Sequence, residues 1–320
     1  MPYNLRNRSF LRELDFTPSE WRFLLGLAAD LKVAKYTGTE VPHLGGRTIA
    51  LLSETAATRT RWAFEVAAYD QGAHVTSLDP DGSRLGQWEP VADTARALGR
   101  CYDGVAYRGS THDHVERLAD HAGVPVWNGR SDEWDPTQSL CDMLTMRDHG
   151  HRPDTDLAFA FCGDARSGTG NSLLVAGAML GMDVRMVAPK ARWNSDHVVR
   201  QARRLADLTG ARITQADDVV AGVHGVDFVC TDGWLPPGEP PDRALERVDL
   251  LRPYRVSMDV LRATGNAHVK FMHPLPAHHD PVDALEVTDE VFQSPNSIVF
   301  EQAENRLHTV KAVLVATLGG

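Results

Sequence analysis

The chain has 320 residues and a mass of 35.2 kDa, which is enough for two α/β domains with cores of their own, and its 42% hydrophobic and 24% charged residues are ordinary for a globular protein. Its formal net charge of −10 disfavours nucleic acid as a partner, because nucleic-acid-binding proteins are usually basic. Residues 1–16 contain no apolar signal core, and no apolar run is long enough to cross a bilayer. We therefore expect a cytoplasmic protein without a membrane partner.

Predicted strands and helices alternate along the first half of the chain. Thr17 and Glu20 have the spacing of a capping box, so a helix is expected to begin there. The apolar run 48–52 (TIALL) is typical of a buried parallel strand. Further strands are predicted at 74–78, 104–107 and 124–126, with helices at 58–70, 92–101, 113–122 and 136–148. This alternation predicts a parallel sheet with helices on both faces.

A second α/β set follows a predicted boundary at 149–153 (HGHRP). Its predicted strands are 157–161, 184–188, 227–230 and 269–272, its helices 171–180 and 195–208, and its proline-rich loop 232–241. Residues 301–317 predict a long amphipathic helix. We predict an α/β protein of two domains, each a parallel sheet flanked by helices, with the active site in the interdomain cleft. The predicted domains are 1–148, completed by the C-terminal helix 301–320, and 152–300.

The four cysteines are Cys101, Cys141, Cys162 and Cys230. They form no CxxC pair, and each lies in an apolar stretch. Buried free thiols are therefore expected, rather than disulfides or a zinc site.

A cluster of hydroxyl and guanidinium groups follows the first predicted strand. Thr58, Arg59, Thr60 and Arg61 stand at the start of the helix predicted at 58–70. A helix N-terminus offers free N–H groups and a positive dipole end, and arginines add forked donors for the same anion. Taken alone, these residues fit a phosphate site and a capped helix with solvated arginines equally well.

Two more polar clusters follow later strands. Arg108 stands directly after the strand predicted at 104–107, at the sheet edge where α/β proteins collect ligands, although such an arginine more often forms a surface ion pair. Asp135-Pro136 begins the helix predicted at 136–148, and Gln138 is expected to face back toward its start. An ordinary Asp N-cap explains this cluster as well.

These motifs resemble the ornithine carbamoyltransferase family. The resemblance runs nearly end to end and includes 57–73 (ATRTRWAFEVAAYDQGA), 107–109 (YRG), 124–129 (VPVWNG), 136–138 (PTQ), 163–166 (GDAR), 273–276 (HPLP) and 300–316 (FEQAENRLHTVKAVLVA). It implies transfer of the carbamoyl group from carbamoyl phosphate to an amine of an amino acid, ornithine or a similar substrate, without metal or organic cofactor. It also implies a role in arginine biosynthesis and a homotrimer with sites shared between subunits.

The resemblance assigns roles to individual residues. In the phosphate half, Thr58, Arg59, Thr60 and Arg61 would hold the phosphate, Arg108 would bridge phosphate and carbonyl oxygen, Gln138 would contact the carbamoyl amide, and Arg306 would reach the carbonyl. In the amine half, Asp232 would bind the α-amino group. His273 and the Leu275–Pro276 bond, expected to be cis, would shape the cleft wall.

Several positions depart from the family pattern, and all belong to the expected site. In the phosphate half, Ala57 replaces a serine, Trp88 stands where a lysine from the neighbouring subunit is expected, and Asp135 replaces a histidine that donates to the carbonyl oxygen. An ionised Asp135 only accepts hydrogen bonds and would repel the phosphate. It would therefore turn toward the carbamoyl NH2, stay protonated or serve another donor. In the amine half, the departures are Gly168, Pro236, Pro237 and Pro274.

Three hypotheses follow. The first is a carbamoyltransferase acting on ornithine or a relative. The second is a paralogue from a specialised pathway with another acceptor or donor, and the third is a binding paralogue with weak catalysis. A nicotinamide dehydrogenase is disfavoured, because 163–171 (GDARSGTGN) lacks the GxGxxG spacing.

Overall fold

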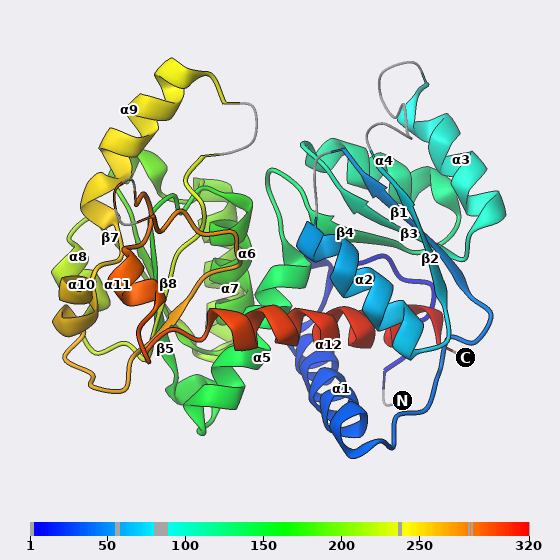
Figure 1. The fold of residues 1–320 in the computed structure, drawn as a ribbon, viewed down its shortest axis with the longest axis horizontal. Coiled ribbons are helices and arrows are strands. Elements are labelled where there is room, and N and C mark those ends of the chain that lie inside the picture. Colours follow the sequence, from blue (N-terminus) through cyan, green and yellow to red (C-terminus); the bar gives the residue numbers. More distant parts are fainter. Residues whose placement is uncertain are drawn as a thin grey trace. The chain divides into compact units, whose positions relative to one another are not determined.

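The computed structural model describes residues 3–54, 58–79, 89–235, 239–280, 282 and 284–319. The chain divides into two compact units (Figure 1). The N-terminal unit comprises Met1–Leu144 and Glu304–Gly320, and the second unit comprises Thr145–Ala303.

The N-terminal unit contains a four-stranded parallel sheet in the order β2-β1-β3-β4. The strands are β1 (Thr48–Ser53), β2 (His74–Leu78), β3 (Gly104–Arg108) and β4 (Val126–Arg130). β1 is almost wholly buried, as its continuous apolar run predicts, whereas β2 at the sheet edge is partly exposed.

Helices α1 (Pro18–Thr37), α2 (Thr58–Asp70), α3 (Val91–Cys101), α4 (His112–Ala122) and the first part of α5 (Pro136–Gly150) belong to the same unit (Figure 1). Thr17 and Glu20 form the predicted capping box at the start of α1. Cys101, the last residue of α3, is exposed, so the prediction of a buried thiol was wrong there. Cys101 is exposed because it is the last residue of a helix whose apolar side faces the sheet. Burial was confirmed for the other three cysteines, Cys141, Cys162 and Cys230.

The C-terminal helix α12 (Val299–Leu318) completes the N-terminal unit from Glu304 onward. It was predicted to be amphipathic, but every residue from His308 to Leu318 is buried. The charge of Lys311 is balanced within the unit, because its Nζ contacts Glu40 Oε1 at 2.5 Å and Asp70 Oδ2 at 2.7 Å. A charged residue in the sequence therefore suggested a solvated face where the fold has a buried ion network.

The second unit contains a five-stranded parallel sheet in the order β7-β6-β5-β8-β9. Its strands are β5 (Ala158–Cys162), β6 (Asp183–Val187), β7 (Arg212–Ala216), β8 (Phe228–Cys230) and β9 (Lys270–Met272). Its helices are α6 (Gly168–Leu180), α7 (Asp196–Thr209), α8 (Val219–Val223), α9 (Pro241–Leu251), α10 (Met258–Ala263) and α11 (Asp289–Phe292), with the end of α5 and the start of α12. Short 3-10 helices lie at Glu13–Asp15, Asp154–Asp156, Lys190–Arg192 and Arg252–Tyr254.

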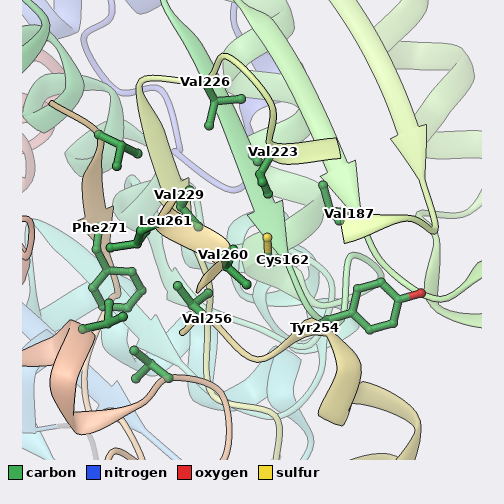
Figure 2. Packing of buried hydrophobic residues seen from close by; sticks show 14 of the residues in the cluster. Cys162, Val187, Val223, Val226, Val229, Tyr254, Val256, Val260, Leu261 and Phe271 are labelled. Atoms are coloured by element: carbon green, nitrogen blue, oxygen red, sulfur yellow. The ribbon is translucent and has the colours of Figure 1, made fainter. Parts of the chain in front are cut away.

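One face of this second sheet carries a valine-rich core (Figure 2). Cys162 and Val229 from the central strands pack there with Val256, Val260 and Phe271. β-Branched side chains suit a buried sheet face because their restricted rotamers lose little freedom on packing. On the same unit, every residue of α6 is buried, which agrees with a sequence that is apolar apart from Thr169, Asn171 and Ser172 near its start.

Candidate active site

The first group of candidate residues lies at the carboxyl edge of the N-terminal sheet. After β1 the chain enters α2 and goes to β2 on one side, whereas after β3 it enters α4 and goes to β4 on the other side. Ligands of open α/β sheets bind at such a divergence of connections. Thr58–Arg61 and Arg108 therefore stand at the sheet edge where ligands of such folds bind.

Thr60 joins two of the predicted arginines. Its side chain is buried, and its Oγ1 accepts a hydrogen bond from Nη1 of Arg108 at 3.0 Å and from Nη2 of Arg306 at 3.4 Å. Arg108 comes from the end of β3 and Arg306 from α12, so the fold brings together residues that are far apart in the sequence.

Arg306 is held by a fork of acceptors. Its Nη1 donates to Gln138 Oε1 at 3.0 Å, and its Nη2 donates to Gly129 O at 3.0 Å and Thr137 Oγ1 at 3.2 Å. Its Nε is a buried donor that has no hydrogen-bond partner among the described residues. A planar guanidinium fixed in this way is well suited to orient a planar ligand.

Gly129 allows the close approach of α2 and β4. A Cβ atom there would lie 2.7 Å from Cγ2 of Thr60. Without a side chain, the carbonyl of Gly129 can reach Arg306 while the first turn of α2 packs against the strand.

Arg59 adds a third positive charge. Burial and the nearby charge of Arg306 both lower the pKa of Arg59, so the two positive charges are close enough to act on each other. Like charges held together in this way favour an anionic ligand.

Arg61 lies on a different side of α2, because two residues turn a helix by about 200°. It is exposed, and it pairs with Glu65 at 2.8 Å and Asp79 at 3.3 Å. The structure thus brings Arg59, Thr60, Arg108, Gln138 and Arg306 together but points Arg61 toward surface carboxylates. Thr58 is exposed in the first turn of α2.

Asp135 lies at the N-terminus of α5 and is 1% exposed. Its Oδ1 accepts hydrogen bonds from the backbone N–H of Gln138 at 3.3 Å and the hydroxyl of Thr137 at 3.4 Å. The same oxygen lies 3.7 Å from Nη2 of Arg306, and Oδ2 lies 4.0 Å from Nη1 of Arg130. Asp135 is therefore both a helix cap and an ion-pair partner of the arginine cluster.

The second group of candidates lies at the equivalent edge of the other sheet, between the carboxyl ends of β5 and β8, where its strand order also diverges. Gly168 is the first residue of α6, after the N-cap Ser167. Asp232 follows β8, and its carboxylate accepts from Thr169 Oγ1 at 2.6 Å and from Gly233 N at 2.7 Å. It is 7% exposed.

His273 is fully buried in the second unit. Its Nδ1 accepts from the N–H of Leu275 at 2.9 Å, so its Nε2 is the donor toward Glu286 Oε1 at 3.2 Å. Glu286 also accepts from the N–H of His278 at 2.7 Å. The ring thus braces the turn that contains Pro274 and Leu275, and the Leu275–Pro276 bond is cis, as predicted.

Ala57, Trp88, Pro236 and Pro237 lie outside the described residues, so their roles stay predictions. Among the described helices, none is long and apolar enough to cross a membrane.

Two family models cover nearly the whole chain. The carbamoyl-phosphate-binding domain of aspartate/ornithine carbamoyltransferases matches residues 8–148, and their aspartate/ornithine-binding domain matches residues 155–317. The chain belongs to the aspartate/ornithine carbamoyltransferase family. It is a transferase that moves a carbamoyl group, and the two α/β domains predicted from its sequence are confirmed.

Known relatives match over their full lengths. The chain is 51% identical to a catabolic ornithine carbamoyltransferase of Chromobacterium violaceum, covering 100% of both chains, and 52% identical to one of Pseudomonas putida, covering 99% of both. The ornithine carbamoyltransferase of Pyrococcus furiosus superimposes with a TM-score of 0.94 at 36% identity, covering 99% of both chains. That of Gloeobacter violaceus gives a TM-score of 0.85 at 34% identity, covering 98% of this chain and 100% of the other.

The expectation of a role in arginine biosynthesis does not agree with the names of the two curated relatives, which are both catabolic. Sequence motifs of the site are set by the chemistry, which is the same in both directions. They therefore carry no sign of the direction in which the enzyme works.

Four residues that contact the candidate residues received no role in the sequence analysis. They are Gly129, Thr137, Thr169 and Glu286. Thr137 stands inside the PTQ motif and Gly129 inside VPVWNG, so those motifs carried a signal for both residues. Thr169 and Glu286 gave no such signal, because only the fold places them beside Asp232 and His273.

Proposed function

We propose that the protein is a cytoplasmic ornithine carbamoyltransferase that works in the catabolic direction, converting citrulline and phosphate to ornithine and carbamoyl phosphate. The observation that carries this proposal is the convergence of Arg108 and Arg306 on Thr60 near the N-terminus of α2, where the charge of Arg306 also acts on Arg59. The full-length identity to catabolic relatives supports the acceptor and the direction.

The phosphate half of the reaction belongs to the N-terminal unit. Thr58, Arg59 and Thr60 would bind phosphate with the free N–H groups at the start of α2. Arg108 donates to Thr60 from the end of β3, which supports a role for its guanidinium in binding the same anion. In the catabolic direction, these groups hold phosphate while one of its oxygens attacks the carbonyl carbon of citrulline.

The carbamoyl half depends on Arg306 and Gln138. Attack on the carbonyl places negative charge on its oxygen, and the positive fork of Arg306 would stabilise that charge. The new carbon–oxygen bond to phosphate forms as the bond to the side-chain nitrogen of ornithine breaks, and the departing amine takes up the proton that the attacking phosphate gives up. The hydrogen bond from Arg306 to Gln138 Oε1 fixes the two side chains relative to each other, which supports a joint role in orienting the carbamoyl group.

The amino-acid half belongs to the second unit. We assign the α-amino group of the substrate to Asp232, at the carboxyl end of β8. Gly168, Pro236, Pro237, His273, Pro274 and Leu275 complete the predicted substrate-binding set. His273 would act through the turn that it braces, since its ring is fully buried.

The test is a two-way assay of purified protein. Citrulline formation from carbamoyl phosphate and ornithine, and ornithine formation from citrulline and phosphate, should both reach at least about 10 per second at saturation. Turnover with another amine from a panel, but not with ornithine, would show that the acceptor is that amine and not ornithine. Binding of carbamoyl phosphate without turnover of any amine would favour the binding paralogue.

We further propose a homotrimer with shared sites. Trp62, Val66 and Tyr69 form a row along the exposed side of α2, and they are 47%, 40% and 80% exposed. Their spacing of four and three residues places them on one helix face. An exposed row of large apolar side chains is typical of a surface that another subunit covers. This row lies on the helix whose N-terminus carries the anion site.

A further inference from the structure

Asp135 places a buried carboxylate among the groups that would bind the phosphate. It is 1% exposed, and it lies 3.7 Å from Arg306 and 4.0 Å from Arg130. An acidic group in an anion site requires a physical reason, because it repels the ligand that the arginines attract.

The first reason is the balance of charge around Thr60. Arg108 and Arg306 both donate to its hydroxyl, and the charge of Arg306 lowers the pKa of Arg59 after the larger effect of burial. Buried guanidinium groups gathered without an anion repel one another. The carboxylate of Asp135 supplies one negative charge from within the protein, next to the most buried of these arginines.

The second reason is that Asp135 holds this position firmly. The carboxylate accepts from the N–H of Gln138 and the hydroxyl of Thr137, so its rotamer is fixed by the first turn of α5. The side chain is therefore held toward Arg306 by contacts within the protein. Nη2 of Arg306 is shared between this carboxylate, Thr60, Thr137 and Gly129.

We propose that Asp135 is a built-in counterion for Arg306 that competes with the bound anion and so speeds the release of carbamoyl phosphate. This inference rests on the proposed function, in which carbamoyl phosphate is a product. A fixed negative charge weakens the binding of any anion in the site, and weaker product binding shortens the time that the product stays bound. Asp135 is a positioning and charge-balancing residue here, and no proton transfer is assigned to it.

The decisive variant is Asp135→Asn. Asparagine has almost the same shape and is an equally good N-cap, so it removes the charge while the amide oxygen still accepts from Gln138. Inorganic phosphate binding would be measured by calorimetry on the full chain. We expect affinity to rise at least about fivefold, the change produced when a unit charge about 4 Å away is removed even at the dielectric constant of water. Asp135→Ser, which also caps, should act in the same direction.

Asp103→Asn is the matched control. Asp103 also pairs with an arginine, through Arg47 at 2.7 Å, and also accepts from a backbone N–H, that of Thr48 at 2.9 Å. It precedes β3, at the amino edge of the same sheet. Its substitution removes the same charge from the same unit and should leave phosphate affinity unchanged.

The outcomes separate this inference from the proposed function. Tighter phosphate binding in both Asp135 variants, with no change in Asp103→Asn, supports the counterion. Unchanged or weaker binding in a folded Asp135→Asn protein overturns it, as does an equal gain in the control. Absence of turnover between ornithine and citrulline in the unaltered protein, with tighter phosphate binding in Asp135→Asn, would overturn the proposed function and leave the counterion standing.

Discussion

Arg306 connects several parts of the candidate site. Its guanidinium contacts Gln138, Gly129 and Thr137 at 3.0 to 3.2 Å. Lysine would keep the charge at this position, but it cannot donate to all three acceptors from one plane. We therefore expect Arg306→Lys to lower kcat by about 10²–10³.

Steady-state kinetics in both directions would check this prediction. Circular dichroism and the melting temperature would show whether the variant is folded. A folded Arg306→Lys enzyme with a kcat within about threefold of the unaltered enzyme would contradict the role of the planar fork.

Thr169 is the residue that fixes Asp232. The hydroxyl of Thr169 donates to Asp232 Oδ2 at 2.6 Å, so Thr169→Val removes the hydrogen bond and keeps the shape. Loss of one such bond costs about 1 kcal/mol, so the KM for ornithine or citrulline should rise about fivefold. The KM for phosphate should not change, because that ligand is assigned to the other unit. Thr169→Ser keeps a hydroxyl at this position and should keep the KM for the amino acid near that of the unaltered enzyme. An unchanged KM for the amino acid in Thr169→Val would exclude a role of the hydroxyl in positioning Asp232.

At this scale the sequence motifs predicted residues that the structure gathers at one sheet edge, and their role toward phosphate stays a prediction. Arg59, Thr60, Arg108, Gln138 and Arg306 stand in motifs of several residues, and the structure places them together. The TRTR motif alone gives no reason to distinguish Arg59 from Arg61. Helix geometry does, because the two residues lie on different sides of α2. The partner of Asp135 could not be predicted, because Arg306 reaches it from α12 through the tertiary fold.

Among the elements, α12 is anchored by a buried ion network. Lys311 is fully buried and pairs with Glu40 and Asp70, and Asp70 also pairs with Lys35 at 2.5 Å. Removing the lysine leaves the half-buried carboxylates of Glu40 and Asp70 without their main cation. We therefore expect Lys311→Met to lower the free energy of unfolding by about 3–5 kcal/mol, measured by urea denaturation at neutral pH.

The stabilisation that Lys311 provides depends on pH, and the pKa of Asp70 gives the direction of that dependence. Burial alone would raise the pKa of Asp70, but its hydrogen bonds with Lys311 and Lys35 outweigh burial and hold the pKa below its ordinary 3.8. The stabilisation is therefore complete above about pH 4 and is lost as the pH falls through the lowered pKa. The difference in the free energy of unfolding between Lys311→Met and the unaltered protein should therefore become smaller in that acidic range.

Lys35→Met provides the comparison for this network. Lys35 pairs with the same Asp70, but its side chain is 34% exposed, so its loss should cost at most about 1 kcal/mol. Equal losses in the free energy of unfolding for Lys311→Met and Lys35→Met would mean that the burial of Lys311 does not determine its contribution to stability.

Strong local patterns made most elements predictable. β1, β2, α2 and α4 follow their predicted spans within a residue, because period and caps agree with the tertiary context. β4 runs through Arg130, past the predicted end at 126, because the partner strand β3 continues to pair with it. β7 (Arg212–Ala216) was missed because it is a partly exposed edge strand with polar side chains. α9 was missed because prolines precede it, although Pro241 occupies its first turn.

For the whole molecule, each sheet presents its candidate residues at the place where its strand order diverges. This follows from topology, and the order β2-β1-β3-β4 cannot be read from the alternation of strands and helices alone. The alternation predicted parallel sheets, and the resemblance predicted which residues matter. The order of the strands then explains why residues after β1 and β3, or after β5 and β8, lie close together.

The oligomeric state gives the prediction that belongs to this scale. Analytical ultracentrifugation should show a species of three times 35.2 kDa for the unaltered protein. Val66→Glu and Tyr69→Glu place charges in the exposed row of α2, and a buried unpaired charge at a subunit interface is strongly unfavourable. Both variants should sediment as monomers. Leu208→Glu, at a residue of α7 that is 79% exposed, should remain trimeric.

Activity of these monomers then tests the shared site. Val66 and Tyr69 lie one to three turns beyond Thr60 on the exposed side of α2, so their substitution leaves every residue assigned to the anion site of each chain unchanged. If a neighbouring subunit completes the site, as Trp88 is predicted to do, turnover should fall at least about tenfold when the trimer dissociates. Dissociation with full turnover would show that each chain carries a complete site, and a trimer that persists in both variants would place the subunit interface elsewhere.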